Sequence, residues 1–357
     1  MPVHRLGPRR IVLLTQGHSE PVAGKTASCL LRYRPEEVVA LLDSTMAGRT
    51  AQDLFGVGGR IPVVASLAEA AGADELVIGI APPGGRIPPA WRPLLLEAIE
   101  RGMRIVSGLH EFLGDDPELQ AAAAARGVEI VDVRRNDEQD VASCADIREG
   151  CTRVLTIGND CSVGKMLTAV ELSRGLVARG LDAALAATGQ TGIMVAGDGC
   201  PIDRVISDFL NGAVEKLVRR LQHHDLLVVE GQASITHPRY SAVSLGLLHG
   251  SMPHGMVLVV EAGRTHHMGM PHVPLPPLPE LVAAYERMAA FAGGGKVIGV
   301  AVNTRLLDEA RAAEAVGQIG DSLGLPACDP VRQGCGPLLD AVESLAASRR
   351  AMAEATG

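Results

Sequence analysis

The sequence predicts an α/β protein of two domains, each with a parallel β-sheet at its centre. Three observations predict this fold class. The chain has 357 residues, about twice the length of a common single domain. Short apolar runs alternate with helical patterns along most of the chain, which is typical of parallel sheets. A glycine-rich segment with a lysine, GNDCSVGK, stands between one such run and a helical pattern.

The first half of the chain contains a series of candidate strands. They are residues 11–17, 38–44, 62–66, 76–80, 104–108 and 129–133. Each is a short apolar run in an alternating strand and helix pattern, so we expect a Rossmann-like domain with a parallel sheet. The opening segment LLTQGHSEPVAGK lacks the GxGxxG pattern, which argues against bound NAD.

The second half repeats this organisation after a polar stretch at residues 136–150 that has neither helical nor strand period. We therefore predict one domain over residues 1–147 and another over residues 148–357. The second series of candidate strands is 153–158, 183–189, 226–231, 256–263 and 296–303. The proline-rich segment at residues 270–279 is interpreted as a stiff connector.

Composition and charge favour a protein that acts on small molecules. The chain has 33 Lys and Arg against 41 Asp and Glu, and its net charge of −8 repels nucleic acids and anionic lipids. Aromatic residues make up 2%, too few for base-stacking platforms or a membrane girdle. Seven cysteines without a CxxC pair, and no long apolar run, predict a cytoplasmic protein. Homo-oligomers are common among such proteins, so we expect one here.

The segment GNDCSVGKM matches the GxxxxGK core of a P-loop, in the required place between a strand and a helix. Gly158 and Gly164 let the backbone wrap an anion, the backbone N–H groups and the helix dipole face it, and Lys165 adds a charge. The second domain is therefore predicted to be P-loop NTPase-like. The predicted cofactor-binding residues are Gly158, Asn159, Asp160, Cys161, Ser162, Val163, Gly164, Lys165 and Met166.

One position departs from the usual P-loop. Met166 stands where a Ser or Thr hydroxyl normally binds Mg²⁺. Thr168 comes two residues later. Successive residues of a helix are rotated by about 100°, so Thr168 is expected on a different side of the helix from position 166 and cannot simply replace the missing hydroxyl. The loop is thus expected to hold a phosphate or pyrophosphate without ordinary nucleotide hydrolysis, which makes coenzyme A a candidate.

Cys161 lies inside this loop, where N–H groups and Lys165 favour a thiolate. It is either a nucleophile that carries an acyl group or a small residue that fills the loop. No histidine close in sequence offers a base, which favours the second interpretation.

Acidic and basic residues follow two later candidate strands. LLVVEGQ places Glu230 at a strand end, where it could be a general base, a metal ligand or only a cap. The next segment brings His237 as a possible base and Arg239 as a carboxylate ligand. His266, His267 and His272 match no zinc spacing and are interpreted as a solvated loop, so no metal is predicted.

The long loop after the strand at 183–189 is rich in polar side chains, as binding loops often are. Its candidates are Gln190, Thr191, Asp198, Asp203, Arg204 and Asp208. We predict Glu230, His237 and Asp198 as catalytic residues. The predicted substrate-binding residues are Lys25, Arg32, Gln190, Thr191, Asp203, Gln232 and Arg239.

GNDCSVGK, TGQTGI, GDGCPIDRVISDF, VVEGQASITHPRYSA and LPACDPVR together resemble the DgcN-type D-glutamate N-acetyltransferase family. The resemblance extends to GKTASCLLRY and LLDSTMAGRTAQDL in the first half, so it spans nearly the whole chain. It implies a Rossmann-like domain followed by a P-loop domain, and transfer of an acetyl group from acetyl-CoA to the amine of D-glutamate. The family motifs of the first half cover Lys25, Thr26, Arg32, Asp43 and Thr45, although Arg32 and Asp43 could instead pair with each other.

Two other functions stay open. GNDCSVGK and VVEGQ resemble, more distantly, the loop and acidic strand of dethiobiotin synthetases, which use Mg-ATP. An ATP- or GTP-dependent ligase or kinase acting on a carboxylate is therefore the alternative enzyme. A regulatory protein that senses a nucleotide without turnover is the third possibility.

Overall fold

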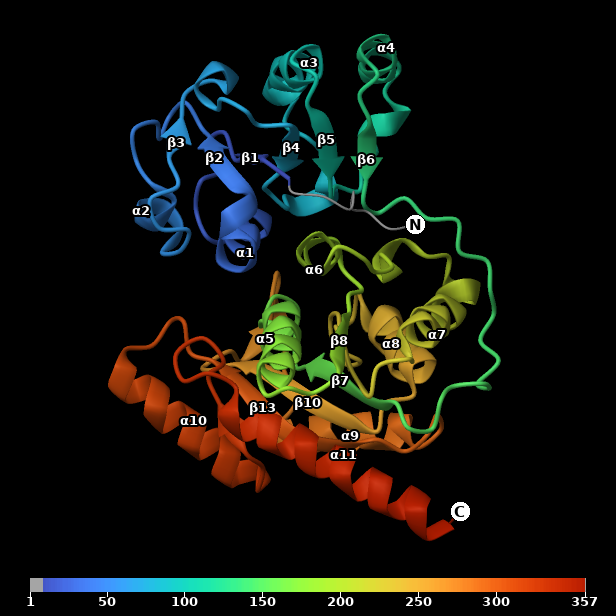
Figure 1. Cartoon of the computed structure of the whole chain (residues 1–357). Helices are drawn as coiled ribbons and strands as arrows, with labels where there is room; N and C mark the ends of the chain where they lie inside the picture. Colours follow the sequence, from blue (N-terminus) through green and yellow to red (C-terminus); the bar gives the residue numbers. More distant parts are fainter. Residues whose placement is uncertain (1–8, 357) are drawn as a thin grey trace. The chain divides into compact units, whose positions relative to one another are not determined.

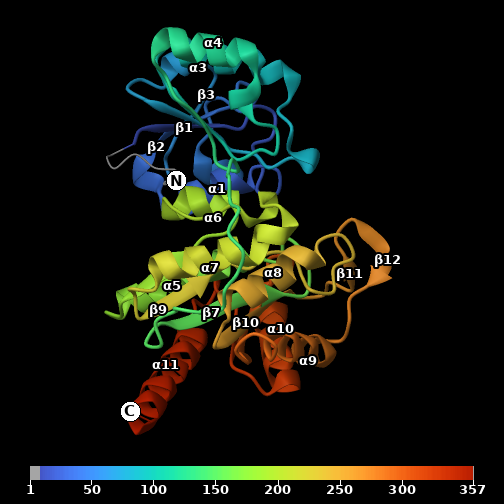
Figure 2. The ribbon, with the colours of Figure 1, turned by 90° about the vertical axis from the view of Figure 1, so that its right-hand side faces the viewer.

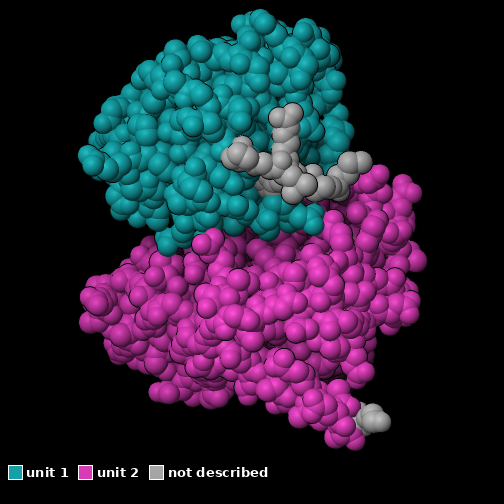
Figure 3. Space-filling view, in the orientation of Figure 1, with its two compact units in different colours: residues 1–135, 193–198 teal, residues 136–192, 199–357 magenta. Residues whose placement is uncertain are grey.

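The computed structural model describes residues 9–356. The chain forms two compact units, coloured separately in Figure 3. Unit 1 comprises Met1–Arg135 and Ile193–Asp198, and unit 2 comprises Asn136–Gly192 and Gly199–Gly357. Each unit has its own sheet and its own apolar core.

The polar segment 136–150 belongs to unit 2. The N–H groups of Ser143 and Cys144 both donate to the Glu215 carboxylate at 2.9 Å, and Lys216 forms an ion pair with Glu138 at 2.9 Å. The predicted boundary at residue 147 therefore falls inside a segment whose preceding residues already bond to unit 2. A polar stretch without helical or strand periodicity indicates where two domains separate, but it does not indicate which domain the stretch packs against.

Unit 1 is a six-stranded parallel sheet in the order β3-β2-β1-β4-β5-β6. Its strands are β1 (Ile11–Leu14), β2 (Val38–Leu42), β3 (Val63–Val64), β4 (Glu75–Ile78), β5 (Arg104–Ser107) and β6 (Ile130–Asp132). Its helices are α1 (Lys25–Tyr33), α2 (Ala51–Phe55), α3 (Arg92–Glu100) and α4 (Pro117–Arg126) (Figure 1). Strand order and parallel pairing are those of a Rossmann fold, as the sequence predicted.

Local sequence explains where the helices of unit 1 begin and end. Thr50 and Asp53 form a reciprocal capping box at the start of α2. Asp116 accepts hydrogen bonds from two N–H groups at the start of α4, and Gly127 ends that helix with φ 65°. The strands between them are nearly continuous apolar runs because helices cover both faces of a parallel sheet.

Unit 2 contains a second six-stranded parallel sheet in the order β14-β13-β10-β7-β9-β8. Its strands are β7 (Thr152–Gly158), β8 (Ala183–Ala186), β9 (Leu226–Val229), β10 (Gly255–Glu261), β13 (Lys296–Asn303) and β14 (Ala327–Cys328). The other helices are α5 (Lys165–Ala178), α6 (Gln190–Ala196), α7 (Leu210–Leu221), α8 (Ser241–Ser251), α9 (Leu278–Ala289), α10 (Glu309–Leu323) and α11 (Gly336–Thr356).

The helices of unit 2 cover both faces of its sheet (Figures 1 and 2). Val154 of β7 packs in one apolar cluster with residues of α5 and α11. Its neighbour Leu155 points to the other face, where residues of α7, α8, α9 and α10 form a second cluster. All candidate strands of the sequence are present, and the two-domain α/β prediction is confirmed.

Two features were not predicted. β14 is only two residues long and pairs with β13 at the sheet edge. β11 (His266–His267) and β12 (Met270–Pro274) form a small antiparallel hairpin, so the proline-rich segment is a strand in its first part rather than only a connector. Over residues 9–356, no helix combines the length and hydropathy needed to cross a bilayer.

The topology places a binding position beside β7. This strand lies between β9 and β10. The next two strands along the chain, β8 and β9, lie on one side of β7, and the strand after them, β10, lies on its other side. Ligands of open α/β sheets bind at such a switch point, outside the carboxyl ends of the strands. The loop after β7 and the residues after β9 meet there.

Candidate functional site

The loop between β7 and α5 has the backbone of an anion-binding loop. Gly164 has φ 116° and Ser162 has φ 56°, and α5 begins at Lys165. A Cβ at Gly158 would lie 3.0 Å from the Lys165 Nζ and 3.1 Å from the Val259 carbonyl oxygen. Glycine at position 158 thus leaves space for the lysine side chain, which passes over the end of β7.

Lys165 is buried and turns back across the loop. Its Nζ donates to the Asp160 carbonyl oxygen at 2.6 Å. Burial lowers the pKa of Lys165 to about 8. An ammonium held in this position, at the N-terminus of α5, favours a bound phosphate group. Met166 is half-buried in the first turn, whereas Thr168 is fully buried.

The Asp160 side chain is used by the protein itself. One carboxylate oxygen accepts from Arg264 at 2.7 Å and from the Met268 N–H at 2.7 Å, and the other accepts from His267 Nδ1 at 3.0 Å. Burial alone would raise the pKa of this carboxyl, but the hydrogen bonds outweigh it and the pKa is lowered. Asp160 therefore ties the P-loop to the β11–β12 hairpin.

This contact corrects the interpretation of the three histidines. His266 and His272 are exposed, as expected of a solvated loop. His267 is buried and bonds to Asp160, so the solvated-loop interpretation is wrong for it. Adjacent residues of a strand point to opposite sides, which is why only one of His266 and His267 reaches the loop.

Glu230 lies just after β9, at the carboxyl end of the strand next to β7. It is buried, and one of its oxygens accepts the N–H groups of Thr188 and Gly189 at 2.9 and 3.1 Å. Burial raises the pKa of this carboxyl to about 7 despite those hydrogen bonds. A Cβ at Gly192 would lie 2.1 Å from the same carboxylate, so α6 approaches Glu230 through a glycine.

His237 is buried beside the P-loop. Its Nδ1 accepts a hydrogen bond from the Arg239 N–H at 3.1 Å. A backbone N–H can only donate, so Nδ1 carries no proton and the ring proton is on Nε2. Burial lowers the pKa of His237, which keeps the ring neutral. Nε2 is 3.5 Å from an Asp160 oxygen and has no hydrogen-bond partner among the described residues.

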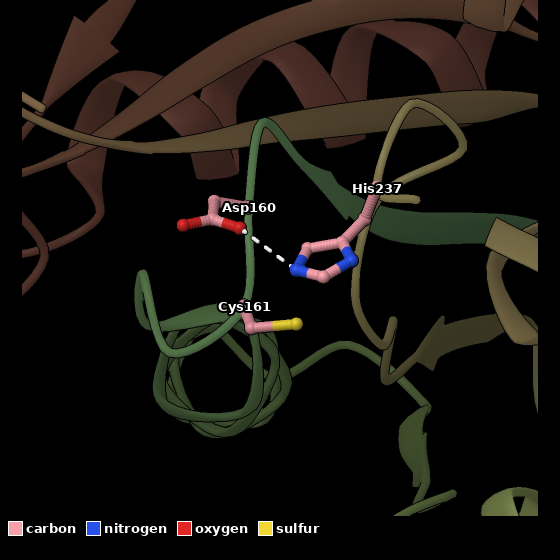
Figure 4. A group of neighbouring side chains, drawn as sticks. All are labelled: Asp160, Cys161 and His237. Atoms are coloured by element: carbon pink, nitrogen blue, oxygen red, sulfur yellow. Dashed lines mark ion pairs between the residues drawn. The ribbon is translucent and has the colours of Figure 1, made fainter. Parts of the chain in front are cut away.

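Three predicted site residues come together in this part of unit 2. One potential ligand atom each of Asp160, Cys161 and His237 lies within 4.8 Å of the others (Figure 4). The donor types would suit a metal ion. Yet both Asp160 oxygens already accept hydrogen bonds, and one of them bonds to the cationic Arg264, so a further cation would displace existing partners.

The remaining predicted residues occupy different places. Gln232 donates to the Thr188 carbonyl oxygen at 2.7 Å, and Gln190 and Thr191 are buried at the start of α6. Asp203 is half-buried and adds negative charge near Glu230, while Arg239 is exposed.

Lys25, Arg32 and Asp198 belong to unit 1, whereas Glu230 and His237 belong to unit 2. Lys25 is the first residue of α1. The possible structural pair of Arg32 with Asp43 is wrong, because Arg32 is exposed and Asp43 bonds to Ser19, Thr45 and the Gly17 N–H.

Sequence reasoning missed two side chains that hold the site. Arg264 bridges Asp160 and Glu261 at 2.7 and 2.8 Å. The hydroxyl of Tyr285 donates to the Gly158 carbonyl oxygen at 3.0 Å and accepts the Ile235 N–H at 3.2 Å. Arg264 directly follows the candidate strand at 256–263, a placement that could have drawn attention to it. Tyr285 lies in a helical pattern with no such signal.

Comparisons with known proteins agree with this architecture. Residues 140–339 match the P-loop domain of the DUF1611 family, described as a domain of unknown function, and residues 44–136 match its Rossmann-like N-terminal domain. A crystal structure of a DUF1611 family protein from Anabaena variabilis has a TM-score of 0.89 and 42% identity, over 94% of this chain and 99% of that chain.

Two relatives carry a functional name. A protein of Tritonibacter scottomollicae, 38% identical over 91% of this chain and 95% of its own length, is named D-glutamate N-acetyltransferase. A protein of a Pseudoalteromonas species with the same name is 37% identical over 75% of this chain and 82% of its own length. The matched domains cover more than half of the chain in the order that the fold shows, and the chain therefore belongs to the DUF1611 family.

Proposed function

We propose that this protein is an N-acetyltransferase that moves an acetyl group from acetyl-CoA to the amine of D-glutamate. The observation that carries the proposal is a P-loop with Met166 in place of the magnesium-binding hydroxyl, in a chain whose relatives are named D-glutamate N-acetyltransferases. Such a loop keeps its means of binding phosphate but lacks a usual part of nucleotide hydrolysis.

In this proposal the loop after β7 binds the phosphates of the cofactor. The N–H groups between Gly158 and Lys165, the N-terminus of α5 and the Lys165 ammonium all offer positive charge to an anion. Asp160 does not oppose this charge freely, because Arg264 neutralises its carboxylate. The thioester would then lie near the carboxyl ends of β7 and β9.

Glu230 is the proposed general base. The amine of an amino acid is protonated at neutral pH and becomes a nucleophile only after it loses a proton. With a pKa of about 7, Glu230 is partly ionised at neutral pH and holds a proton far better than an ordinary carboxylate. The amine nitrogen attacks the thioester carbonyl, the C–S bond breaks, and the CoA sulfur ends with a proton.

An ATP- or GTP-dependent ligase or kinase is the second candidate, favoured by Lys165 and by the acid at the end of β9. Two observations speak against it. Met166 offers no hydroxyl to Mg²⁺. Glu230 already accepts two N–H groups and has a raised pKa, both of which weaken a carboxylate as a magnesium ligand.

The test is turnover by the purified protein. With acetyl-CoA and D-glutamate we expect release of free CoA thiol together with an equal amount of N-acetylated amino acid, and much less with L-glutamate. No magnesium should be required. Magnesium-dependent release of ADP or phosphate in the presence of ATP and an amino acid, without thiol release from acetyl-CoA, would replace the acetyltransferase by the ligase or kinase.

A further inference from the structure

We propose that Cys161 carries the acetyl group as a thioester between the release of CoA and the attack of the amine. This inference rests on the acetyl transfer proposed above and adds a covalent intermediate to it. It is carried by the juxtaposition of Cys161 with a buried hydrogen-bond donor that has no acceptor among the described residues.

The fold supplies the histidine that the sequence around Cys161 lacks. His237 comes from the segment after β9, and a ring nitrogen of His237, the Cys161 sulfur and an Asp160 oxygen lie within 4.8 Å of one another (Figure 4). Cys161 is only partly buried, so a cofactor can reach it. His237 would favour a Cys161 nucleophile by stabilising its thiolate, not by taking the thiol proton.

The protonation state of His237 fixes its role. Because Nδ1 accepts the Arg239 N–H, the proton is on Nε2, and Nε2 acts as a donor rather than as a base. Buried donors without a partner are rare, and a catalytic role, in which the donor meets a charge that forms during the reaction, is one explanation for such a group. A Cys161 thiolate beside His237 would be a negatively charged acceptor for the Nε2–H group.

The surroundings of Cys161 favour a thiolate. Cys161 precedes α5 in the anion-binding loop, and the Lys165 ammonium is close enough to interact electrostatically with it. Asp160 is the negative group in the cluster, and one of its oxygens lies 3.5 Å from His237 Nε2, but its ion pair with Arg264 and its hydrogen bonds from His267 and the Met268 N–H already compensate its charge. Helix, lysine and His237 Nε2–H thus stabilise the nucleophile together.

The two steps balance. In the first, the Cys161 thiolate attacks the acetyl carbonyl, a new C–S bond forms, the C–S bond to CoA breaks, and the CoA thiolate leaves and takes a proton from water. In the second, the neutral amine attacks the Cys161 thioester, a C–N bond forms, the C–S bond breaks, and Cys161 is released as a thiolate. Glu230 accepts the proton that the amine loses and passes it to water.

Isotope exchange tests the first step without any amine acceptor. The wild-type protein is incubated with acetyl-CoA and labelled CoA, and transfer of the label into acetyl-CoA is followed. We expect exchange in the absence of D-glutamate, and one acetyl group on the peptide that contains Cys161. Hydroxylamine at neutral pH should remove this acetyl group, because it cleaves thioesters and leaves an amide on Lys165 intact.

Variants locate the chemistry. Cys161→Ala should abolish exchange while acetyl-CoA still binds. His237→Ala should slow exchange by about 10²-fold, the effect of losing one well-placed donor, and His237→Gln should recover part of the rate because its amide offers an N–H in a similar position. Cys144→Ser is the matched control, since Cys144 is exposed and lies in the segment 136–150, and it should exchange at the wild-type rate.

The outcomes separate this inference from the proposed function. If N-acetyl-D-glutamate forms but no exchange occurs, or if Cys161→Ala turns over at the wild-type rate, the thioester is overturned and direct transfer from acetyl-CoA stands. If exchange and hydroxylamine-sensitive labelling occur but D-glutamate gives no product, Cys161 is the acetyl carrier and only the assigned amine substrate is wrong.

Discussion

Glu230 sets the expected pH dependence of the reaction. A general base acts in its ionised form, and burial raises the pKa of Glu230 to about 7. We therefore predict that kcat/KM for D-glutamate, measured at saturating acetyl-CoA, rises as pH increases through about 7 and levels off above it. Glu230→Gln should lower the rate by about 10²–10⁴-fold and remove this rise. A variant that keeps both the rate and the pH profile would assign the base elsewhere.

The same carboxyl affects folding stability with a definite sign. Its pKa is higher in the folded protein than in the unfolded chain, so the folded state binds more protons between the two values. This group's contribution to the free energy of unfolding is therefore constant below its unfolded pKa and falls as pH rises toward about 7. Urea unfolding from pH 5 to 8 should show this decline, and Glu230→Gln should show less of it.

Lys165 is expected to link cofactor binding to pH. Burial lowers the pKa of its ammonium to about 8 in the free protein, so the charge is lost as pH rises through that value. Acetyl-CoA affinity should accordingly be weaker at pH 9 than at pH 7. Lys165→Ala should weaken binding by about tenfold or more at pH 7, the effect of one charged hydrogen bond. Equal affinity in variant and wild type would remove the P-loop from cofactor binding.

The sequence predicted some residues of the candidate site but not the hydrogen bonds and ion pairs that hold them. GxxxxGK, and an acid at the end of a strand, are local patterns, so Lys165 and Glu230 could be named as candidates from the sequence. His267, Arg264 and Tyr285 contact the P-loop only because the sheet brings distant segments together. Their side chains stand in no local pattern that distinguishes them from loop or core residues.

Replacing either of two helical glycines by alanine is expected to change the stability of the protein, with opposite signs at the two positions. In Gly192→Ala the new Cβ would lie 2.1 Å from Glu230, so α6 or the carboxylate must move. We expect a loss of about 1–3 kcal/mol of stability together with a lower kcat. Gly317→Ala lies inside α10, exposed and with nothing near the new Cβ, and should stabilise the protein by about 0.5–1 kcal/mol without changing kcat.

Denaturant unfolding and steady-state kinetics of the two variants provide the check. A Gly192→Ala protein with wild-type kcat would show that α6 does not need its close approach to Glu230. The Gly317→Ala protein controls for the general effect of replacing a helical glycine.

Strands with long apolar runs were predictable, whereas short edge elements were not. β7 and β10 are each buried along their whole length, and such continuous apolar runs are easily recognised. β14 has two residues, too few for any period to show. The β11–β12 hairpin is mostly exposed and contains two prolines, so its sequence carries neither a buried run nor a regular alternation.

At the scale of the whole molecule, ligand binding is expected to raise thermal stability. A ligand that binds only the folded protein stabilises it by about 2.7 kcal/mol at one hundred times its Kd. Acetyl-CoA should therefore raise the Tm in a concentration-dependent way, and Mg-ATP should not. Differential scanning calorimetry of the wild type and of Lys165→Ala checks this, since the variant should show a smaller shift at the same acetyl-CoA concentration. A Tm that rises equally in both proteins would place the bound cofactor away from Lys165.

The division of the chain into two domains was predictable from the sequence, but the exact composition of each compact unit was not. Two parallel-sheet domains in the order Rossmann-like and P-loop were predicted correctly, because each strand and helix alternation is a local signal. The grouping of Ile193–Asp198 with unit 1 depends on tertiary contacts that no local pattern reveals. A homo-oligomer and the domain boundary at residue 147 stay predictions.

Calorimetric titration of the wild-type protein with acetyl-CoA, and separately with ATP and Mg²⁺, tests the central claim most directly. The claim is that the loop from Gly158 to Met166 binds a CoA thioester rather than a magnesium nucleotide. We predict saturable binding of acetyl-CoA without magnesium and no measurable heat with Mg-ATP. Magnesium-dependent binding of ATP with no binding of acetyl-CoA would contradict the account and favour the ligase or kinase.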